Sequence, residues 1–271
     1  FDRIKRPIQL TSEGHTFLEL ITPIVDSLDT LKNQMDYSEK RGSFLVGAYP
    51  DIAMYHLPAA IRSFRGQYPE VHIRLRARPF SALMQLVKSG EIDLALCTRP
   101  SGDDPLLEFQ PLFQYNMVLM TPPNHPLLEI HPVQFEDIAR WPLIHLGPES
   151  STRHKIDQTL KEQGITCDFA LEMDNTELIK RYVEIGMGVA MCSDFTLHPE
   201  DHDKLGVVRL NHLFTSSSIG VCTLKGKFLG RAVRNFMNTL SEDLTGYHVE
   251  LWDWESTHKQ LEEAEAVNQN D

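Results

Sequence analysis

The chain has 271 residues, of which 41% are hydrophobic, and a formal net charge of −12 at pH 7. This length and apolar content allow one large or two ordinary domains with real cores, and the sequence contains no apolar run long enough to span a membrane. A surface this acidic repels phosphate backbones, so we do not expect the bulk of the chain to bind nucleic acid by itself.

Residues 1–10 form a basic start that contains Arg3, Lys5 and Arg6. No apolar stretch follows it, so it does not read as a secretory signal. The sequence does not begin with Met, and we therefore expect more chain before Phe1. By itself, the local positive charge fits either a DNA-facing element or a solvated end.

A long helix is predicted within residues 11–40, with Thr11 as its N-cap. Its apolar positions are spaced four and three residues apart, which is the heptad pattern of a dimerising coiled coil. These positions are Phe17, Ile21, Ile24, Leu28, Leu31 and Met35. A core helix of a globular domain would show the same stripe, but the position before the first predicted strand favours a linker and dimerisation helix.

Strands and helices alternate from residue 41 onward. Apolar runs at 44–47, 71–76 and 92–97 are separated by helical segments, the second of which ends at Gly90. This order predicts a parallel sheet with helices on both faces. We assign residues 41–119 and 217–243 to this first subdomain.

A second unit of the same kind is predicted for residues 120–216, so the fold class is α/β with two Rossmann-like subdomains after the linker helix. Its strands are expected at 143–146, 169–173 and 189–192, with helices near 151–163 and 176–185. Residues 244–271 form an acidic tail.

The four cysteines form no C-x-x-C pair, and three of them lie in apolar runs. Free cysteine in such positions behaves as a small hydrophobe, and this usage is typical of a reducing compartment. We therefore expect free thiols and a cytoplasmic location.

The sequence offers no catalytic signature, since nucleophile-elbow, Walker A and dinucleotide-binding motifs do not occur in it. His198 and His202 have zinc-like spacing, but Pro199 disfavours the regular helix that would place both rings on one face. No catalytic residue, metal or cofactor is expected.

Candidate ligand-binding residues follow the predicted strands, where ligands of open α/β sheets bind. Hydroxyl and acidic residues at helix starts are ordinarily N-caps, so the convergence of several strand ends on one cleft carries the prediction. The residues are Tyr49, Asp51, Phe80, Ser81, Thr98, Arg99, Ser151, Thr152, Arg153, Asp174, Asn175 and Ser193.

Several short motifs together resemble the bacterial LysR-type transcriptional regulators over nearly the whole chain. They include Leu10–Gly14, Gly42–Gly47, Gly90–Ala95 and Tyr182–Ala190. The C-terminal part, with motifs such as His212–Ser216, is most similar to the CysB-like branch that controls cysteine biosynthesis.

This resemblance implies that residues 1–10 are the remnant of a winged helix-turn-helix wing, with Arg3, Lys5 and Arg6 near promoter DNA. It also implies a dimerising linker helix and two periplasmic-binding-protein type II-like subdomains that close on a small co-inducer. Allosteric control, homodimers or homotetramers on promoter DNA, and RNA polymerase as a further candidate partner belong to the same expectation, with no membrane association.

One departure from the branch concerns ligand chemistry. The branch has a threonine-rich loop after the first strand, suited to sulfate or acetylserine, whereas this chain has Ala48–Ile52 there. The carboxylates of Asp51, Glu149 and Asp174 make an anion site less favourable. We hypothesise that the ligand is not sulfate and carries an amine or another cationic or donor-rich group.

Two other classes of protein share this predicted architecture. A periplasmic solute-binding protein would need a signal peptide or lipid anchor and would have no heptad helix. A two-domain α/β enzyme such as a transferase would need a catalytic cluster in the cleft, where this sequence has helix caps and hydroxyls instead.

Overall fold

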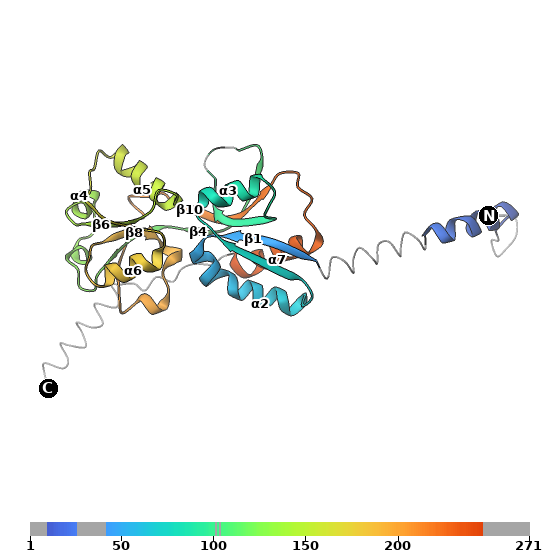
Figure 1. Ribbon diagram of the computed structural model, residues 1–271, viewed down its shortest axis with the longest axis horizontal. Helices are drawn as coiled ribbons and strands as arrows, with labels where there is room; N and C mark the ends of the chain where they lie inside the picture. The colour runs from blue at the N-terminus through green and yellow to red at the C-terminus, as the bar shows by residue number, and fades with distance from the viewer. Residues whose placement is uncertain (1–9, 26–41, 101, 103, 246–271) are drawn as a thin grey trace, which may run out of the picture.

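The computed structural model describes residues 10–25, 42–100, 102 and 104–245 (Figure 1). The basic residues Arg3, Lys5 and Arg6, the heptad positions Leu28, Leu31 and Met35, and the acidic tail beyond residue 245 lie outside the described residues. Among the helices that are described, none combines the length and apolar character needed to cross a membrane.

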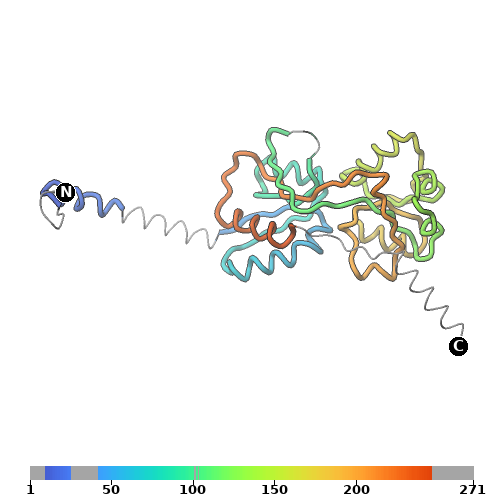
Figure 2. The backbone as a smooth tube through the Cα atoms, turned by 180° about the vertical axis from the view of Figure 1, so that it is seen from behind, coloured from blue at the N-terminus to red at the C-terminus, as the bar shows by residue number. Residues whose placement is uncertain are grey.

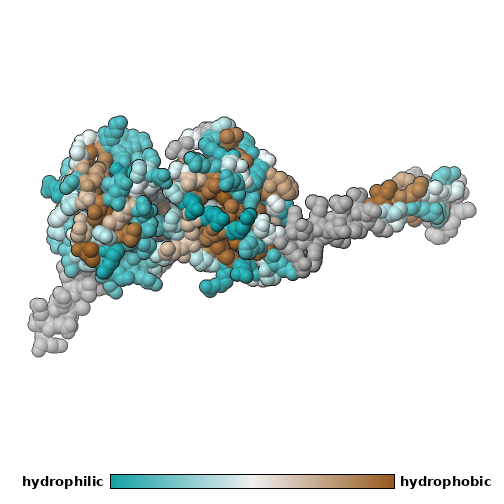
Figure 3. All heavy atoms as spheres, in the orientation of Figure 1, coloured by the Kyte–Doolittle hydropathy of each residue, from teal (hydrophilic) through white to brown (hydrophobic). Residues whose placement is uncertain are grey.

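The N-terminal helix covers residues 12–25 within the described part of the chain. Thr11 is its N-cap as predicted, since its hydroxyl accepts a hydrogen bond from the Gly14 amide at 3.1 Å. The apolar stripe does not pack into a globular core: Phe17 is 66% exposed and Ile24 is 55% exposed. Figure 3 shows hydrophobic side chains gathered on the surface of this helix.

The first lobe, here called lobe I, is built on a five-stranded mixed sheet of order β2-β1-β3-β10-β4. Its strands are β1 (Ser43–Ala48), β2 (His72–Ala77), β3 (Leu94–Thr98), β4 (Leu107–Tyr115) and β10 (Ser217–Leu224). The parallel arrangement predicted for the first three strands is confirmed. The two later strands differ, because β10 runs antiparallel to both β3 and β4.

Helices cover both faces of this sheet, with α3 on one side and α2 and α7 on the other (Figure 1). A short π-helical turn, η1 (Ile52–His56), leads directly into α2. The helices are α2 (Leu57–Gln67), α3 (Phe80–Lys88) and α7 (Arg231–Leu244). Gly90 ends α3 with a φ of 74°, as its sequence position predicted. Phe44, Phe64 and Phe236 form the centre of the core, with ring centroids 5.2 to 5.9 Å apart.

The second lobe, lobe II, contains a three-stranded sheet of order β8-β5-β9 and the pair β6-β7. Its strands are β5 (Met117–Thr121), β6 (Leu143–Leu146), β7 (Phe169–Met173), β8 (Ala190–Ser193) and β9 (Gly206–Arg209). A parallel bridge between Leu143 and Val189 joins the two sheets. The lobe is therefore one continuous β layer.

Six short or regular helices complete lobe II, and two of them position the site. They are η2 (Pro126–Glu129), α4 (Phe135–Ile138), α5 (Ser151–Glu162), α6 (Thr176–Glu184), η3 (Asp194–Thr196) and η4 (Pro199–Asp201). Both α5 and α6 begin directly after a strand of the β6-β7 pair. Their N-termini therefore meet at the strand ends that face lobe I.

The chain crosses between the lobes twice, as Figure 2 shows in backbone form. Tyr115 still pairs with Ser217 in lobe I, whereas Met117 already pairs with Ser193 in lobe II. The first crossing is thus at Asn116, whereas the predicted boundary between residues 119 and 120 lies inside β5. The strand β10 of lobe I begins at Ser217.

Candidate functional site

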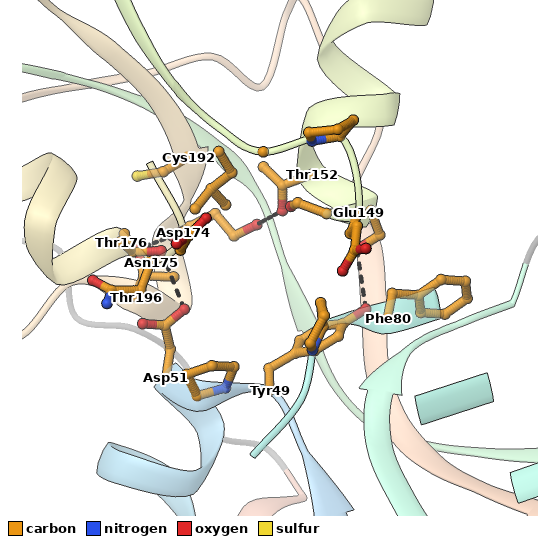
Figure 4. Close-up of a pocket in the computed structure, with 18 of the residues that line it drawn as sticks. Tyr49, Asp51, Phe80, Glu149, Thr152, Asp174, Asn175, Thr176, Cys192 and Thr196 are labelled. Atoms are coloured by element: carbon orange, nitrogen blue, oxygen red, sulfur yellow. Dashed lines mark hydrogen bonds between the residues drawn. The ribbon is translucent and has the colours of Figure 1, made fainter. Parts of the chain in front are cut away.

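A cavity of about 520 Å³ lies between the two lobes. Its walls come from the ends of β1 and the start of α3 in lobe I, and from the starts of α5 and α6 and the end of β8 in lobe II (Figure 4). This volume is within the range of small organic ligand sites. The cavity lies where the carboxyl ends of parallel strands from both lobes meet.

Tyr49, directly after β1, joins the two lobes across the cavity. Its hydroxyl lies 2.9 Å from the Thr98 hydroxyl in the same lobe and 3.0 Å from the Ser151 hydroxyl at the start of α5. Burial raises the pKa of Tyr49 well above its ordinary value, so the side chain is a neutral phenol. It acts here as a hydrogen-bonding bridge.

Asp51, two residues further along the chain, makes a second bridge. Its carboxylate accepts a hydrogen bond from the Thr176 hydroxyl of α6 at 3.2 Å, and Figure 4 shows this contact spanning the two lobes. Burial raises the pKa of Asp51 from 3.8 to about 6, although the Thr176 hydroxyl and the Lys180 charge act in the opposite direction. Near neutral pH the carboxylate is therefore ionised at an energetic cost.

The start of α5 supplies hydroxyl groups to the upper wall in Figure 4. Ser150 is the N-cap, and its side chain accepts from the Arg153 amide. The Thr152 hydroxyl lies 3.3 Å from that of Ser193 at the end of β8. These side chains form a polar wall whose hydrogen-bonding groups are already partly paired with one another.

All charged side chains of the lining are acidic. Four carboxylates line the cavity, and none of the lining residues is Lys, Arg or His; the carboxylates belong to Asp51, Glu149, Glu172 and Asp174. The lining therefore has no Ser–His or Cys–His pair of the kind that nucleophilic catalysis uses. Among the residues that the structure describes, no group of three or more His, Cys, Asp or Glu could hold a metal ion.

Eight of the twelve residues predicted from the sequence line the cavity. They are Tyr49, Asp51, Phe80, Ser151, Thr152, Asp174, Asn175 and Ser193. The structure thus brings together strand-end residues from both lobes, as the strand-end argument predicted.

The other four predicted residues lie elsewhere. Thr98 is buried behind Tyr49, and Ser81 is exposed on α3. The Arg99 guanidinium lies over the Phe109 ring at 4.7 Å. The guanidinium of Arg153 turns away to Asp157, one helical turn along α5, at 2.6 Å.

Four more lining residues belong to the strand-end segments that the sequence indicated, namely Pro50, Glu149, Ser150 and Thr176. The other lining residues were not predicted: Pro79, Leu146, Gly147, Pro148, Glu172, Cys192, Phe195 and Thr196. Phe195 and Thr196 lie in the 3-10 turn η3, for which the sequence pattern gave no signal.

Two further contacts, made by the η1 residues Tyr55 and His56, join lobe I to lobe II. The His56 ring nitrogen lies 2.8 Å from the Phe195 carbonyl oxygen, and the Tyr55 ring stacks on His198 with centroids 3.4 Å apart. Burial, together with the Lys180 charge, lowers the pKa of His198 to about 4. His198 is therefore neutral near pH 7, and the stack joins two uncharged rings.

Two α/β lobes, two crossing segments and a cavity between strand ends define a receptor domain for a small molecule. Residues 38–245 match the family model described as the LysR substrate binding domain. The chain belongs to the LysR family of transcriptional regulators.

Individual relatives agree with this assignment. The chain is 32% identical to the HTH-type transcriptional regulator CysB of Burkholderia cenocepacia, over 89% of this chain and 77% of the relative. It is 25% identical to the HTH-type transcriptional regulator cbl of Escherichia coli, over 96% and 83%. The solved cofactor-binding domain of the Cbl transcriptional regulator matches with a TM-score of 0.68 and 27% identity, over 77% of this chain and 90% of that domain.

These relatives are HTH-type transcriptional regulators, and the predicted LysR-type and CysB-like resemblance is confirmed. They do not favour the alternative of a periplasmic solute-binding protein. The effector domain of QuiR, solved with shikimate, shares the fold with a TM-score of 0.67 at 19% identity.

Proposed function

We propose that this regulator senses a small-molecule effector in the cavity between lobe I and lobe II and transmits its binding to DNA-bound subunits. The observation that carries this proposal is the 520 Å³ cavity walled by both lobes. A molecule bound there contacts both lobes at once. It therefore favours one relative arrangement of the lobes over others, which is the requirement for allosteric control.

The bridges across the cavity support this coupling. The Tyr49–Ser151 and Asp51–Thr176 contacts each join a strand end of lobe I to a helix start of lobe II. Any ligand that displaces or reinforces them acts directly on the contacts between the two lobes.

The exposed heptad stripe supports self-association. Phe17 and Ile24 expose apolar side chains that a second copy of the helix would bury. We propose a homodimer through this stripe, with Phe17, Ile21, Ile24, Leu28, Leu31 and Met35 as the interface, and homotetramers on DNA.

The DNA-binding part of the proposal rests on the family, since the relatives named above are HTH-type regulators. We propose a winged helix-turn-helix ahead of the linker helix, promoter DNA near Arg3, Lys5 and Arg6, a cytoplasmic location, and no catalytic activity. RNA polymerase is a further proposed partner.

A cavity-filling variant tests the function without knowledge of the effector. Thr152→Trp places a large ring in the cavity, while Thr166→Trp places the same ring at an exposed site on lobe II outside it. Each variant would replace the natural gene in the native host, and genome-wide occupancy and transcripts would be measured across growth conditions.

We expect Thr152→Trp to retain DNA occupancy but lose condition-dependent transcription, and Thr166→Trp to behave as the natural protein. Circular dichroism of the purified variants checks that both fold. A Thr152→Trp protein that still responds to growth conditions would contradict an effector site in this cavity.

A further inference from the structure

We propose that the effector is an organic cation whose ammonium or guanidinium group is held by Asp51 and Asp174. This inference rests on the proposed function of the cavity as the effector site. Figure 4 shows the two carboxylates on one side of the cavity and Glu149 on the opposite side. A second cationic or hydrogen-bond-donating end of the effector would face Glu149.

The lining of the cavity has no positively charged side chain to balance its carboxylates. Neither Lys nor Arg nor His is among the lining residues, whereas four side chains are carboxylates. Within the described part of the chain, no cationic side chain lies within ion-pair distance of Asp51, Glu149 or Asp174. A negative field that the protein does not neutralise favours a positive ligand.

Two cations beside the site, Arg153 and Lys180, are already engaged by other groups. The Arg153 guanidinium lies 2.6 Å from Asp157 and 5.0 Å from the centre of the Phe169 ring. Of the lining it contacts Glu172, at 3.7 Å, and the Leu146 carbonyl oxygen, at 3.3 Å. The Lys180 ammonium lies 2.8 Å from Glu177 and 2.7 Å from Asp201. Neither is free to bind an anionic group in the cavity.

The hydroxyl donors of the walls are already engaged, since those of Ser151 and Thr152 lie within hydrogen-bond distance of Tyr49 and Ser193. An anion would also approach unpaired carboxylates in a partly enclosed site, where charge repulsion is stronger than in water. The walls therefore disfavour sulfate and simple carboxylates.

The size of the cavity also fits an organic ligand. A cavity of about 520 Å³ is far larger than a hydrated inorganic ion needs and matches a small organic molecule. Pro50, Pro79, Phe80 and Phe195 supply apolar surface for the hydrocarbon part. Aromatic faces such as that of Phe80 also attract ammonium and guanidinium groups.

The state of Asp51 agrees with this ligand class. Burial holds the pKa of its carboxyl near 6, so the empty site maintains an ionised carboxylate that its surroundings disfavour. A bound cation would supply the missing counter-charge. The carboxylate is destabilised in the free protein and stabilised in the complex.

The experiment uses isothermal calorimetry on the full chain with three matched sets of probes: linear alkane diamines, the diols of the same lengths, and the dicarboxylates of the same lengths. These sets differ in charge and hardly in shape. We expect binding by at least one diamine and none by the matching diol or dicarboxylate. Asp51→Asn and Asp174→Asn should each weaken it about 10- to 100-fold, the range for a lost hydrogen bond to a charged group.

The matched control is Asp203→Asn, which removes the same charge from a side chain that is 96% exposed and outside the cavity; it should leave diamine affinity unchanged. Asp174→Asn lies on an exposed position, so the test survives if Asp51→Asn folds poorly. Failure of every diamine to bind, preferential binding of dicarboxylates, or diamine binding that both Asn variants retain would each overturn the cation assignment.

Thr152→Trp separates this result from the proposed function. Dicarboxylate binding that Thr152→Trp abolishes would keep the cavity as the effector site and reject only the cation. Binding of any probe that Thr152→Trp leaves intact would place the ligand outside the cavity and reject both.

Discussion

Replacing Asp51 by Asn should stabilise the protein, and more so at higher pH. Burial raises the pKa of the folded-state carboxyl from 3.8 to about 6, and each pKa unit corresponds to about 1.4 kcal/mol. Ionised Asp51 therefore costs the folded state about 3 kcal/mol at most. Asn is neutral and similar in shape, and its side-chain oxygen can still accept from Thr176.

The direction of the pH dependence of stability follows from proton binding at Asp51. Between pH 3.8 and about 6 the folded state binds more protons at Asp51 than the unfolded state does, so the stability of the natural protein falls as pH rises through this window. The charged groups facing Asp51 are Lys180 and Glu177 of α6. Lys180 lowers the pKa of Asp51 and Glu177 raises it, and the pKa of about 6 includes both effects.

The assay is urea unfolding of both proteins at several pH values. Linkage gives a gain for Asp51→Asn of about 3 kcal/mol near pH 7.5 and about 1.6 kcal/mol near pH 5. Asp203→Asn, on an exposed side chain, should show no such trend. An Asp51→Asn gain that is equal at both pH values, or a loss near pH 7.5, would refute a carboxylate destabilised by burial.

Three further outcomes are expected. Phe64→Ala removes a fully buried ring that packs against Phe236 at 5.2 Å, and it should lower the free energy of unfolding by about 3–5 kcal/mol in urea titrations; a change near zero would contradict the core described above. Tyr49→Phe removes a hydroxyl 3.0 Å from that of Ser151, and it should cost about 1–2 kcal/mol in the same assay because two buried hydrogen bonds are lost. Ile24→Asp places a charge on the exposed heptad stripe, so sedimentation velocity should show monomer in place of dimer; an unchanged dimer would exclude this stripe as the interface.

The sequence predicted those parts of the fold that depend on local patterns. Uninterrupted apolar runs gave β1 and β3, and the start of the linker helix at Thr11 followed from capping chemistry. β4 was missed because it contains Pro111 and forms the sheet edge, where its pairing with β10 has a register shift at Gly220. Nothing local encodes a partner strand more than a hundred residues away.

In the candidate site, too, general and local rules predicted some residues, whereas distant contacts decide the position of others. Tyr49 and Asp51 were found because strand ends of α/β sheets converge, which is a general rule of the architecture. Arg153 was included on the same ground, but its guanidinium pairs with Asp157 four residues later. That i, i+4 spacing is visible in the sequence and is a reason to discount such a residue. The direction of the Arg99 side chain depends on Phe109 in β4, which β10 separates from β3, and it could not be read from the sequence.

The place of β10 has a consequence for biosynthesis. Lobe I cannot close its sheet until the ribosome has passed residue 224, since β10 inserts between β3 and β4, whereas all strands of lobe II lie between residues 117 and 209. Lobe II, which begins later in the sequence, therefore has all its strands before lobe I does. Until β10 is synthesised, β3 and β4 each have an unpaired edge. A premature stop codon between residues 209 and 217 should release a folded lobe II attached to an incomplete lobe I sheet with exposed strand edges. We expect this product to aggregate rather than to act as a shorter regulator.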